Sequence, residues 1–323
     1  MIIKMKKIIT MSIIGLLVIM NFMITPVSSE ENTTEYDFYV DDDFNETNPG
    51  WNWSHFDNIQ DSLDAAENGY SIFVYNGIYN ENLDIKKEIA LEGENNEETI
   101  IRSGFDTDTI QVLADNVEIS NLKIISKGSL SKTIYSKDYN YLTITNNYLE
   151  GDWIGIRLYS SNNNKIQNNY LYNCSISIHG SNHNNISKNT IIGKGLSFAR
   201  SNDNEILYNT IKSTDTGIAT NEGTFNNFIR YNIVRDCGVG INVGAQDQNI
   251  ISYNDFKFNK YMNVLIQSSE CDWFHNYWGG TERFPRARIL QLPKIIVGFG
   301  YPKFFIDFDW HPAIRPNCDF NYD

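Results

Sequence analysis

The chain has few cysteines and few basic residues for its 323 residues. Its four cysteines show no C-x-x-C spacing, which argues against a dense disulfide framework and against a zinc site. Its 26 Lys and Arg residues are outnumbered by 40 Asp and Glu residues, so the formal net charge is −14. A protein this acidic repels nucleic acid phosphates and anionic lipids. We therefore expect neither nucleic acid nor a membrane surface as its partner.

The first 29 residues are predicted to be a signal peptide. Lys4, Lys6 and Lys7 give a basic start, residues 8–24 are mostly apolar, and small residues precede Glu30. That order is typical of a secretory signal and predicts cleavage after residue 29, which leaves a secreted or cell-surface protein. An uncleaved membrane anchor is the alternative, because the apolar run is near the lower length limit for spanning a bilayer. Without its three Lys residues the formal charge goes from −14 to −17.

One short phrase recurs along the chain: an apolar residue, two polar residues, an Asn, one further residue and a second apolar residue. Each period contains two short alternating segments, which are too short for helices. We expect one coil of a parallel β-solenoid per period, each coil lying ~4.8 Å above the last. The inward apolar side chains of successive coils would then form one continuous core. The phrase Asn residues are spaced by 20 to 23 residues and are Asn147, Asn169, Asn189, Asn209, Asn232, Asn254 and Asn276.

Stacked coils place each phrase Asn above the previous one, which predicts a structural ladder of side-chain amides at a turn. A second ladder is expected five residues earlier in each coil, where Cys271 takes the last place. Its Asn residues are Asn164, Asn184, Asn204, Asn227 and Asn249.

The same register limits disulfide pairing. Cys174 and Cys237 share a column but are three coils apart, about 14 Å, which is beyond disulfide reach. A disulfide between Cys271 and Cys318 could tie the tail to the final coil. Four buried or free thiols are the alternative.

Both ends of the repeat region are expected to be covered. Ile59, Leu63 and Ala66 recur at helical spacing, after a capping-box pattern at Ser54 and Asp57. A short helix there would cover the open end of a solenoid. The repeat period of 20 to 23 residues is lost in residues 281–323, which are expected to cover the C-terminal end. The predicted organisation is a signal peptide at 1–29, an N-terminal lead and capping helix at 30–67, a β-helix at 68–280 and a C-terminal cap at 281–323.

Residues 56–94, FDNIQDSLDAAENGYSIFVYNGIYNENLDIKKEIALEGE, resemble the opening of pectin-lyase-like right-handed β-helix proteins. The repeats after them are similar to those of the NosD-type family, and YVDDDFNETNPGWNWSHFDNIQ together with NYWGG and FIDFDWHP resembles an archaeal secreted group. The resemblance implies an all-β, single-stranded, right-handed parallel β-helix with an N-terminal capping helix and an irregular C-terminal cap. It implies little about activity, because this superfamily includes lyases, hydrolases, epimerases and adhesins.

The outward residues of the second segment form two columns, which begin at Arg157 and Tyr159 and contain neither Asp nor Glu. A hydrolase needs a pair of carboxylates, so we expect no hydrolase site on this face. Arg157, Tyr159, His179 and Arg200 lie on three adjacent coils. They could hold an anionic sugar or form a lyase site that uses no metal. Scattered solvated side chains are the alternative.

Asp41, Asp43 and Asn45 resemble the start of a calcium loop. Glu46 replaces the required Gly and Asn52 occupies the twelfth position, which excludes an EF-hand. A looser structural calcium site and simple solvated acids both remain as interpretations. Copper, implied by the NosD resemblance, would require clustered His, Met or Cys, and the five His residues are dispersed. No other cofactor is expected.

Together these patterns predict a secreted, monomeric β-helix protein that binds extracellular polysaccharide or cell-envelope glycan, or that serves as an envelope component, without catalysis. A polysaccharide lyase that uses the Arg157 group is the first alternative. An accessory protein for metal-centre assembly, implied by the NosD resemblance alone, is the second. Five sequons would permit N-glycosylation and begin at Asn32, Asn45, Asn52, Asn173 and Asn185.

Overall fold

The computed structural model describes residues 35–221, 223–244, 248–267, 271–279, 294–300, 303–309, 311–313 and 315–318. The chain divides into two compact units, Met1–Glu35 and Tyr36–Asp323, and the described elements belong to the second unit. The expected signal peptide at 1–29 lies outside the described residues. No helix in the described part has the length and hydropathy of a membrane-spanning segment.

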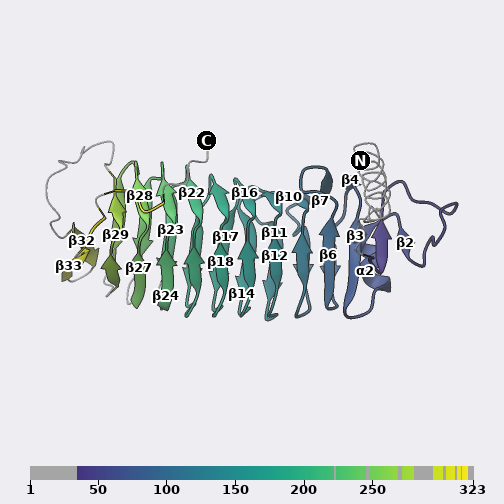
Figure 1. Cartoon of the computed structure of the whole chain (residues 1–323), viewed down its shortest axis with the longest axis horizontal. Coiled ribbons are helices and arrows are strands. Elements are labelled where there is room, and N and C mark those ends of the chain that lie inside the picture. The colour runs from purple at the N-terminus through teal and green to yellow at the C-terminus, as the bar shows by residue number, and fades with distance from the viewer. Residues whose placement is uncertain are drawn as a thin grey trace, which may run out of the picture. The chain divides into compact units, whose positions relative to one another are not determined.

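The second unit is a parallel β-helix, as predicted from the repeat. From β3 (Tyr70–Val74) to β28 (Asp255–Lys257), each strand pairs in parallel with the strand three places after it. For example, β15 (Lys165–Gln167) lies between β12 (Thr143–Thr145) and β18 (Asn185–Ser187). This regular step builds three parallel sheets around one core (Figure 1).

In the described residues, the first sheet (sheet A) has 12 strands and the second (sheet B) has 10. In addition to the three strands above, sheet A contains β2 (His55–Phe56), β1 (Phe38–Val40), β3 (Tyr70–Val74), β6 (Ile89–Gly93), β9 (Glu118–Ser120), β21 (Glu205–Leu207), β24 (Phe225–Arg230), β27 (Gln248–Ser252) and β30 (Asp272–Phe274). Sheet B contains β4 (Gly77–Tyr79), β7 (Thr99–Phe105), β10 (Lys123–Lys127), β13 (Tyr148–Glu150), β16 (Tyr170–Tyr172), β19 (Thr190–Ile192), β22 (Thr210–Lys212), β25 (Ile233–Arg235), β28 (Asp255–Lys257) and β31 (Tyr277–Trp278).

The third sheet (sheet C) has nine strands in the described part and carries the candidate site. Its strands are β5 (Leu83–Ile85), β8 (Ile110–Val112), β11 (Lys132–Lys137), β14 (Ile154–Tyr159), β17 (Ser175–His179), β20 (Leu196–Ala199), β23 (Thr216–Asn221), β26 (Val239–Val243) and β29 (Met262–Ile266).

The core consists of in-register columns of apolar side chains inside the coils. In sheet A, Ile144, Ile166, Ile186, Ile206 and Ile229 pair in succession and are all fully buried. Burial of one such side chain stabilises the fold by roughly 1.5–3 kcal/mol. Because strand side chains alternate between the two faces, the neighbours of these residues point to solvent and are free to carry function.

The first coil begins earlier than the expected boundary at residue 68. Strand β1 pairs with β2 and with β3, so residues from Phe38 onward already belong to sheet A. The expected helix is present as α2 (Ile59–Ala65), but the predicted capping box is wrong. Asn58 is the N-cap and accepts a hydrogen bond from the backbone N–H of Asp61. The hydroxyl of Ser54 instead lies 2.9 Å from the His55 ring.

Two charged side chains of the next coil hold the ends of α2. The Glu81 carboxylate accepts hydrogen bonds from the backbone N–H groups of Ile59 and Gln60, at 2.9 and 2.8 Å. The Lys87 ammonium donates to the carbonyl oxygens of Asp64 and Ala66, at 2.8 and 2.5 Å. Each charge therefore complements the helix dipole at its own end.

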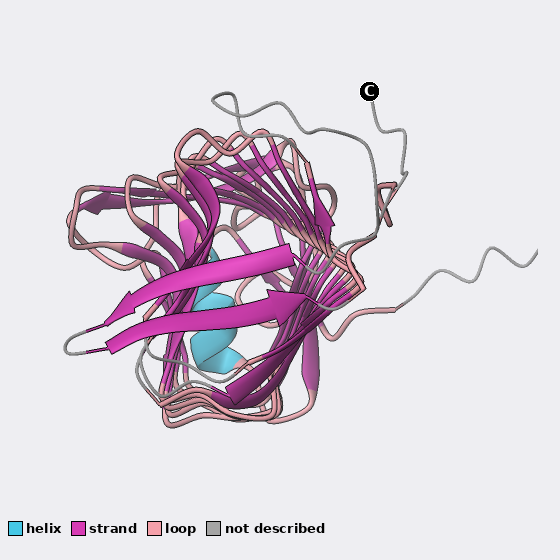
Figure 2. Cartoon of the chain, turned by 90° about the vertical axis from the view of Figure 1, so that its left-hand side faces the viewer, coloured by secondary structure: helices cyan, strands magenta, loops and turns pink. Residues whose placement is uncertain are grey.

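A two-stranded antiparallel hairpin of β32 (Lys294–Gly300) and β33 (Lys303–Asp309) contacts β29 and β30 at the C-terminal end. Figure 2 shows the hairpin crossing the end of the solenoid. Of the expected C-terminal cap at 281–323, residues 281–293, 301–302, 310, 314 and 319–323 lie outside the described residues. The buried Asp309 carboxylate accepts hydrogen bonds from the backbone and side-chain N–H groups of Asn276, from Nε1 of Trp278 and from the backbone of His311.

Candidate functional site

The predicted ladder Asn residues form a continuous hydrogen-bonded column at one corner of the solenoid. Each donates its backbone N–H and its Nδ2 to the Oδ1 of the next ladder Asn, at 2.9–3.2 Å. Each Nδ2 also donates to a carbonyl of the previous coil, such as Asn147 to Ile119. All of these Asn side chains are buried. The column is therefore structural and offers no donor to a ligand.

The cysteines are also buried. Burial raises the pKa of Cys237 to about 11 and raises that of Cys174 further, so both thiols are protonated near neutral pH. Cys271 accepts a hydrogen bond from the backbone N–H of Asn249, as its place in the second ladder predicts. Cys271 and Cys318 are both buried near the C-terminal end. A disulfide between them stays a prediction.

The fold brings Arg157, Tyr159 and His179 together on neighbouring strands of sheet C. The Tyr159 and His179 rings stack with centroids 4.9 Å apart and planes 10° apart, and Lys137 lies over the Tyr159 ring at 5.7 Å. Arg157 Nη1 is 3.4 Å from the Ser177 hydroxyl. Burial, Arg157 and Arg200 all lower the pKa of His179, so its imidazole is neutral at pH 7. We call Lys137, Arg157, Tyr159, His179 and Arg200 the basic cluster.

The expectation that this face lacks carboxylates is wrong for the earlier coils. The outward column that passes through Arg157 continues in register to Tyr135, then to Gln111 and to Asp84. Asp84 is therefore an outward residue of sheet C. It is not evident from the repeat, because coils ahead of β11 depart from the recurring phrase.

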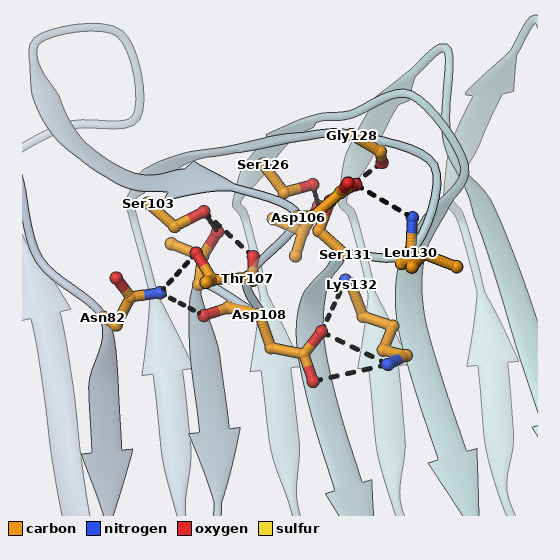
Figure 3. Close-up of polar contacts among 12 residues, drawn as sticks. Asn82, Ser103, Asp106, Thr107, Asp108, Ser126, Gly128, Leu130, Ser131 and Lys132 are labelled. Atoms are coloured by element: carbon orange, nitrogen blue, oxygen red, sulfur yellow. Dashed lines mark hydrogen bonds and ion pairs between the residues drawn. The ribbon is translucent and has the colours of Figure 1, made fainter.

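Two irregular turns lie beside strands β8 and β11 of sheet C. Strand β7 has seven residues and β10 has five, whereas β13 and β16 have three, and the pairing of β7 with β10 shifts register after Ile125. The extended strands carry the turns at 106–109 and 128–131 out over β8 and β11 (Figure 3). Irregular segments on a rigid scaffold are typical positions for binding sites.

Hydrogen bonds fix both turns in place. Asn82 Nδ2 donates to Thr107 Oγ1 at 3.1 Å and to the carbonyl of Asp108 at 2.6 Å (Figure 3). The Asp108 carboxylate accepts from the backbone N–H of Lys132 at 2.8 Å and lies 3.3 Å from the Lys132 ammonium. Asp106 Oδ1 accepts from the backbone N–H of Leu130 at 3.3 Å. The site is therefore largely preformed.

These turns and strands line an open cleft of about 470 Å³, which we call the sheet C cleft. Its lining combines residues that carry amide, carboxylate, hydroxyl and ammonium groups with two leucines. The lining residues are Asn82, Leu83, Asp84, Asp106, Thr107, Asp108, Gln111, Leu130 and Lys132.

Trp153 lies on the coil after Lys132, the coil that also carries Arg157 and Tyr159 of the basic cluster. It immediately precedes Ile154, which pairs with Lys132 of the cleft, so Trp153 lies one coil beyond the lining residues. Its side chain is 47% exposed, and its carbonyl accepts hydrogen bonds from the backbone and hydroxyl of Ser175. An indole on a fixed backbone next to a polar cleft is well suited to contact the apolar face of a sugar.

Among the described residues, one group of side chains could hold a metal ion: Asp41, Asp42 and Asp43, whose carboxylate oxygens lie within 4.8 Å of one another. The Asn45 side chain is instead engaged with Asp43 and Thr47 within its own loop. A calcium ion at these acids stays a prediction. A group of three oxygen donors without His or Cys does not fit a copper centre.

Comparison with known proteins places the chain among right-handed β-helices. Residues 106–257 match the family model described as "Right handed beta helix region". No curated protein sequence matches the chain.

Solved structures resemble the chain in fold. The Dettilon tailspike protein is 15% identical with a TM-score of 0.52, over 68% of this chain and 50% of its own. The catalytic domain of an alpha-1,3-glucanase in complex with nigerose is 13% identical with a TM-score of 0.48, over 68% and 53%. Pectin methylesterase PemA from Erwinia chrysanthemi is 12% identical with a TM-score of 0.38, over 79% and 92%.

The chain spans about half the length of the tailspike protein that it resembles. At such low identity the likeness concerns the fold alone. The fold of the described residues is thus a right-handed parallel β-helix. The narrower NosD-type or archaeal relationship stays a prediction.

Proposed function

We propose that the protein binds an extended polysaccharide on the outer face of sheet C, outside the cell or at its surface, without catalysis. The observation that carries this proposal is the sheet C cleft of about 470 Å³, with the exposed indole of Trp153 beside it. Sugar hydroxyls are bound by amide, carboxylate and ammonium groups, and sugar rings pack against aromatic faces. Both kinds of contact are available here within a few coils.

The carboxylates of the cleft favour binding over hydrolysis. Asp108 is paired with Lys132 and Asp84 with Lys86, each at 3.3 Å, and Asp106 accepts a hydrogen bond from a backbone N–H. A glycosidase needs one carboxyl group as an acid and another as a base or nucleophile, both directed at the scissile bond. Here the carboxylates hold the turns and the ammonium groups in place, which suits a fixed binding surface.

One observation favours a polysaccharide lyase as a second candidate. The neutral imidazole of His179, beside Tyr159 and Arg157, could accept a proton from a uronate ring while the guanidinium binds the carboxylate. A lyase releases unsaturated uronates, which absorb in the ultraviolet. Appearance of that absorbance with wild-type protein, and its loss with His179→Gln, would replace binding by catalysis as the function of this face.

We infer the partner class from the overall charge. The excess of acidic residues argues against nucleic acid, so an extracellular polysaccharide or envelope glycan is the partner that we propose. We also propose a monomer, since α2 lies at one end of the solenoid and the β32–β33 hairpin crosses the other (Figures 1 and 2). Sedimentation of the purified chain measures this directly.

A glycan array with the full chain, followed by titration of each bound glycan, tests the proposed function. We expect Trp153→Ala to weaken binding roughly tenfold or more, because an aromatic anchor is lost. Trp53→Ala is the matched control, since Trp53 is 81% exposed but lies in the loop between β1 and β2. Equal losses in the two variants, or no bound glycan at all, would contradict a glycan site at the sheet C cleft.

A further inference from the structure

The loop between β1 and β2 contains a sequon whose Asn amide and Thr hydroxyl already contact each other. Asn45, Glu46 and Thr47 are all exposed. The loop that contains them leads into β2 (Figure 1). The Oδ1 of Asn45 accepts hydrogen bonds from the backbone N–H of Thr47 at 3.1 Å and from its hydroxyl at 2.7 Å. The Asn-X-Thr pattern marks N-glycosylation acceptors, in which the Asn amide is modified and a hydroxyl stands two residues later.

The nitrogen that would be modified, Asn45 Nδ2, contributes little to holding the loop together. Asn45 Nδ2 donates to the carbonyl of Asp43 at 3.2 Å, at an exposed position where water can replace that bond. The loop is held by other contacts, including the backbone N–H of Asn45 on Asn48 Oδ1 at 2.9 Å. A substituent on Nδ2 would therefore point to solvent without displacing any core contact.

The sequon at Asn185 lies instead within a paired strand of sheet A. Ser187 also donates to Asn185 Oδ1, at 2.7 Å, but Ser187 is only 5% exposed. Asn185 Nδ2 donates to Glu205 at 2.9 Å, and β18, which contains this sequon, pairs with strands on both sides. A transferase could reach this amide only after the sheet had opened.

The two remaining described sequons also have their hydroxyl groups engaged elsewhere. Ser54, two residues after Asn52, is 2.9 Å from the His55 ring, and Gly50 O accepts three backbone N–H groups of the same tight turn. Ser175, two residues after Asn173, donates to the carbonyl of Trp153, and the residue between them is the fully buried Cys174. The Asn32 sequon lies outside the described residues.

We propose that Asn45 is an acceptor site for an N-linked oligosaccharide. A bond forms between Asn45 Nδ2 and the anomeric carbon of a sugar that is supplied by a lipid-phosphate-linked oligosaccharide. The bond between that carbon and the lipid phosphate breaks, and the phosphate leaves with the bonding electrons, while Nδ2 gives up one proton. Thr47 is a positioning residue, because its hydroxyl fixes the orientation of the amide.

The test uses the folded full-length protein as the acceptor. It is incubated with a lipid-linked oligosaccharide and a single-subunit oligosaccharyltransferase that requires only the Asn-X-Ser/Thr sequon. Protease digests of the same protein, treated in parallel, measure how well each sequon is accepted without the fold. Mass spectrometry of glycopeptides then gives the occupancy of each site, and the ratio of folded to digested occupancy isolates the effect of structure.

We expect Asn45 to be occupied in both samples, and Asn173 and Asn185 to be occupied at least tenfold less in the folded chain than in the digest. Thr47→Ser should retain occupancy at Asn45, and Thr47→Ala should abolish it. An Asn45 that is unmodified in the folded chain, or modified no more than Asn185, would overturn the proposal. Full occupancy in Thr47→Ala would overturn the role of the hydroxyl.

Discussion

At the scale of single residues, the corner of the solenoid shows how stacking offsets local strain. The residue before each ladder Asn has a positive φ, which Asn tolerates but Tyr does not readily adopt. Tyr208, Tyr231 and Tyr253 nonetheless occupy this position, with ring centroids 5.0 and 5.2 Å apart. The stacking stabilises each pair by about 0.5–1.5 kcal/mol, which is comparable to the strain. Because these rings cover one another's faces, they offer less to a sugar than Trp153.

The buried ladder makes a prediction about stability. Asn209→Ala should lower the free energy of unfolding by roughly 2–4 kcal/mol, because buried donors and acceptors lose their partners. The Asn189 backbone N–H and Nδ2 both lose Oδ1 of Asn209, and the Ile186 carbonyl loses its donor. Denaturant unfolding followed by circular dichroism measures the change. Thr210→Ala, one residue further on the outer face, is the control and should lower the free energy of unfolding much less. Equal losses in the two variants would contradict a stabilising role of the ladder.

The ladder residues could be predicted from the sequence, whereas the cleft residues could not. Stacking repeats one environment at every coil, so a column such as Asn147 to Asn276 is visible as a period in the sequence. Asp84, Asp108 and Trp153 lie in or beside coils whose turns differ in length from the rest. Asp84 and Asp108 line one cleft beside the register shift between β7 and β10, which no periodicity encodes. The basic cluster could be predicted in part. Its residues recur in regular columns, but the stacking of the Tyr159 and His179 rings is not visible in the sequence.

At the scale of elements, α2 illustrates how a short helix depends on its neighbours. Seven residues are too few for an isolated helix, so the buried Ile59 and Leu63 and the two charged contacts must hold it in place. The pattern of apolar residues was sufficient to predict the helix. Its N-cap at Asn58 was missed although its contact with Asp61 is local, whereas the contacts of Glu81, 22 residues further along the chain, could not be predicted from the local sequence.

Glu81 makes the stability of this end dependent on pH. Burial raises the pKa of Glu81 above its usual 4.5, although the two helix N–H groups act in the opposite direction. The folded state thus holds this proton more tightly than the unfolded chain does. The resulting stability is fully present below pH 4.5 and is lost as pH rises through the folded pKa.

Glu81→Gln has no titrating carboxyl at this position. As pH rises from 4.5 toward neutral, the unfolding temperature of the wild type should therefore fall relative to that of the variant. Thermal unfolding over a series of pH values provides the measurement. Glu88→Gln, an exposed acid on the same coil, should show no such trend relative to wild type. A constant difference for Glu81→Gln would show that burial of this carboxyl has no effect on folding.

At the scale of the whole molecule, a solenoid is stable only if both of its ends are closed. Each coil contacts only its neighbours, so the last coil would expose its core and its unpaired strand edges to another copy. At the C-terminal end, Asp309 occupies the position of the next ladder residue. Its carboxylate accepts hydrogen bonds from Asn276, just as each ladder Asn accepts them from the ladder Asn before it. It also accepts a hydrogen bond from Trp278 Nε1 at 2.9 Å. The hairpin is thereby joined to the ladder.

Removing this contact should open the C-terminal end. In Asp309→Ala the N–H groups of Asn276 and Trp278 lose their acceptor inside the protein, which should release the hairpin and allow association through the exposed strand edges. We expect faster proteolysis at the hairpin and a concentration-dependent increase in mass by light scattering. In Asp309→Asn the side-chain oxygen can still accept from Asn276, so this variant should stay close to wild type. Association of Asp309→Asn to the same extent would mean that the negative charge, and not the position in the ladder, keeps this end closed.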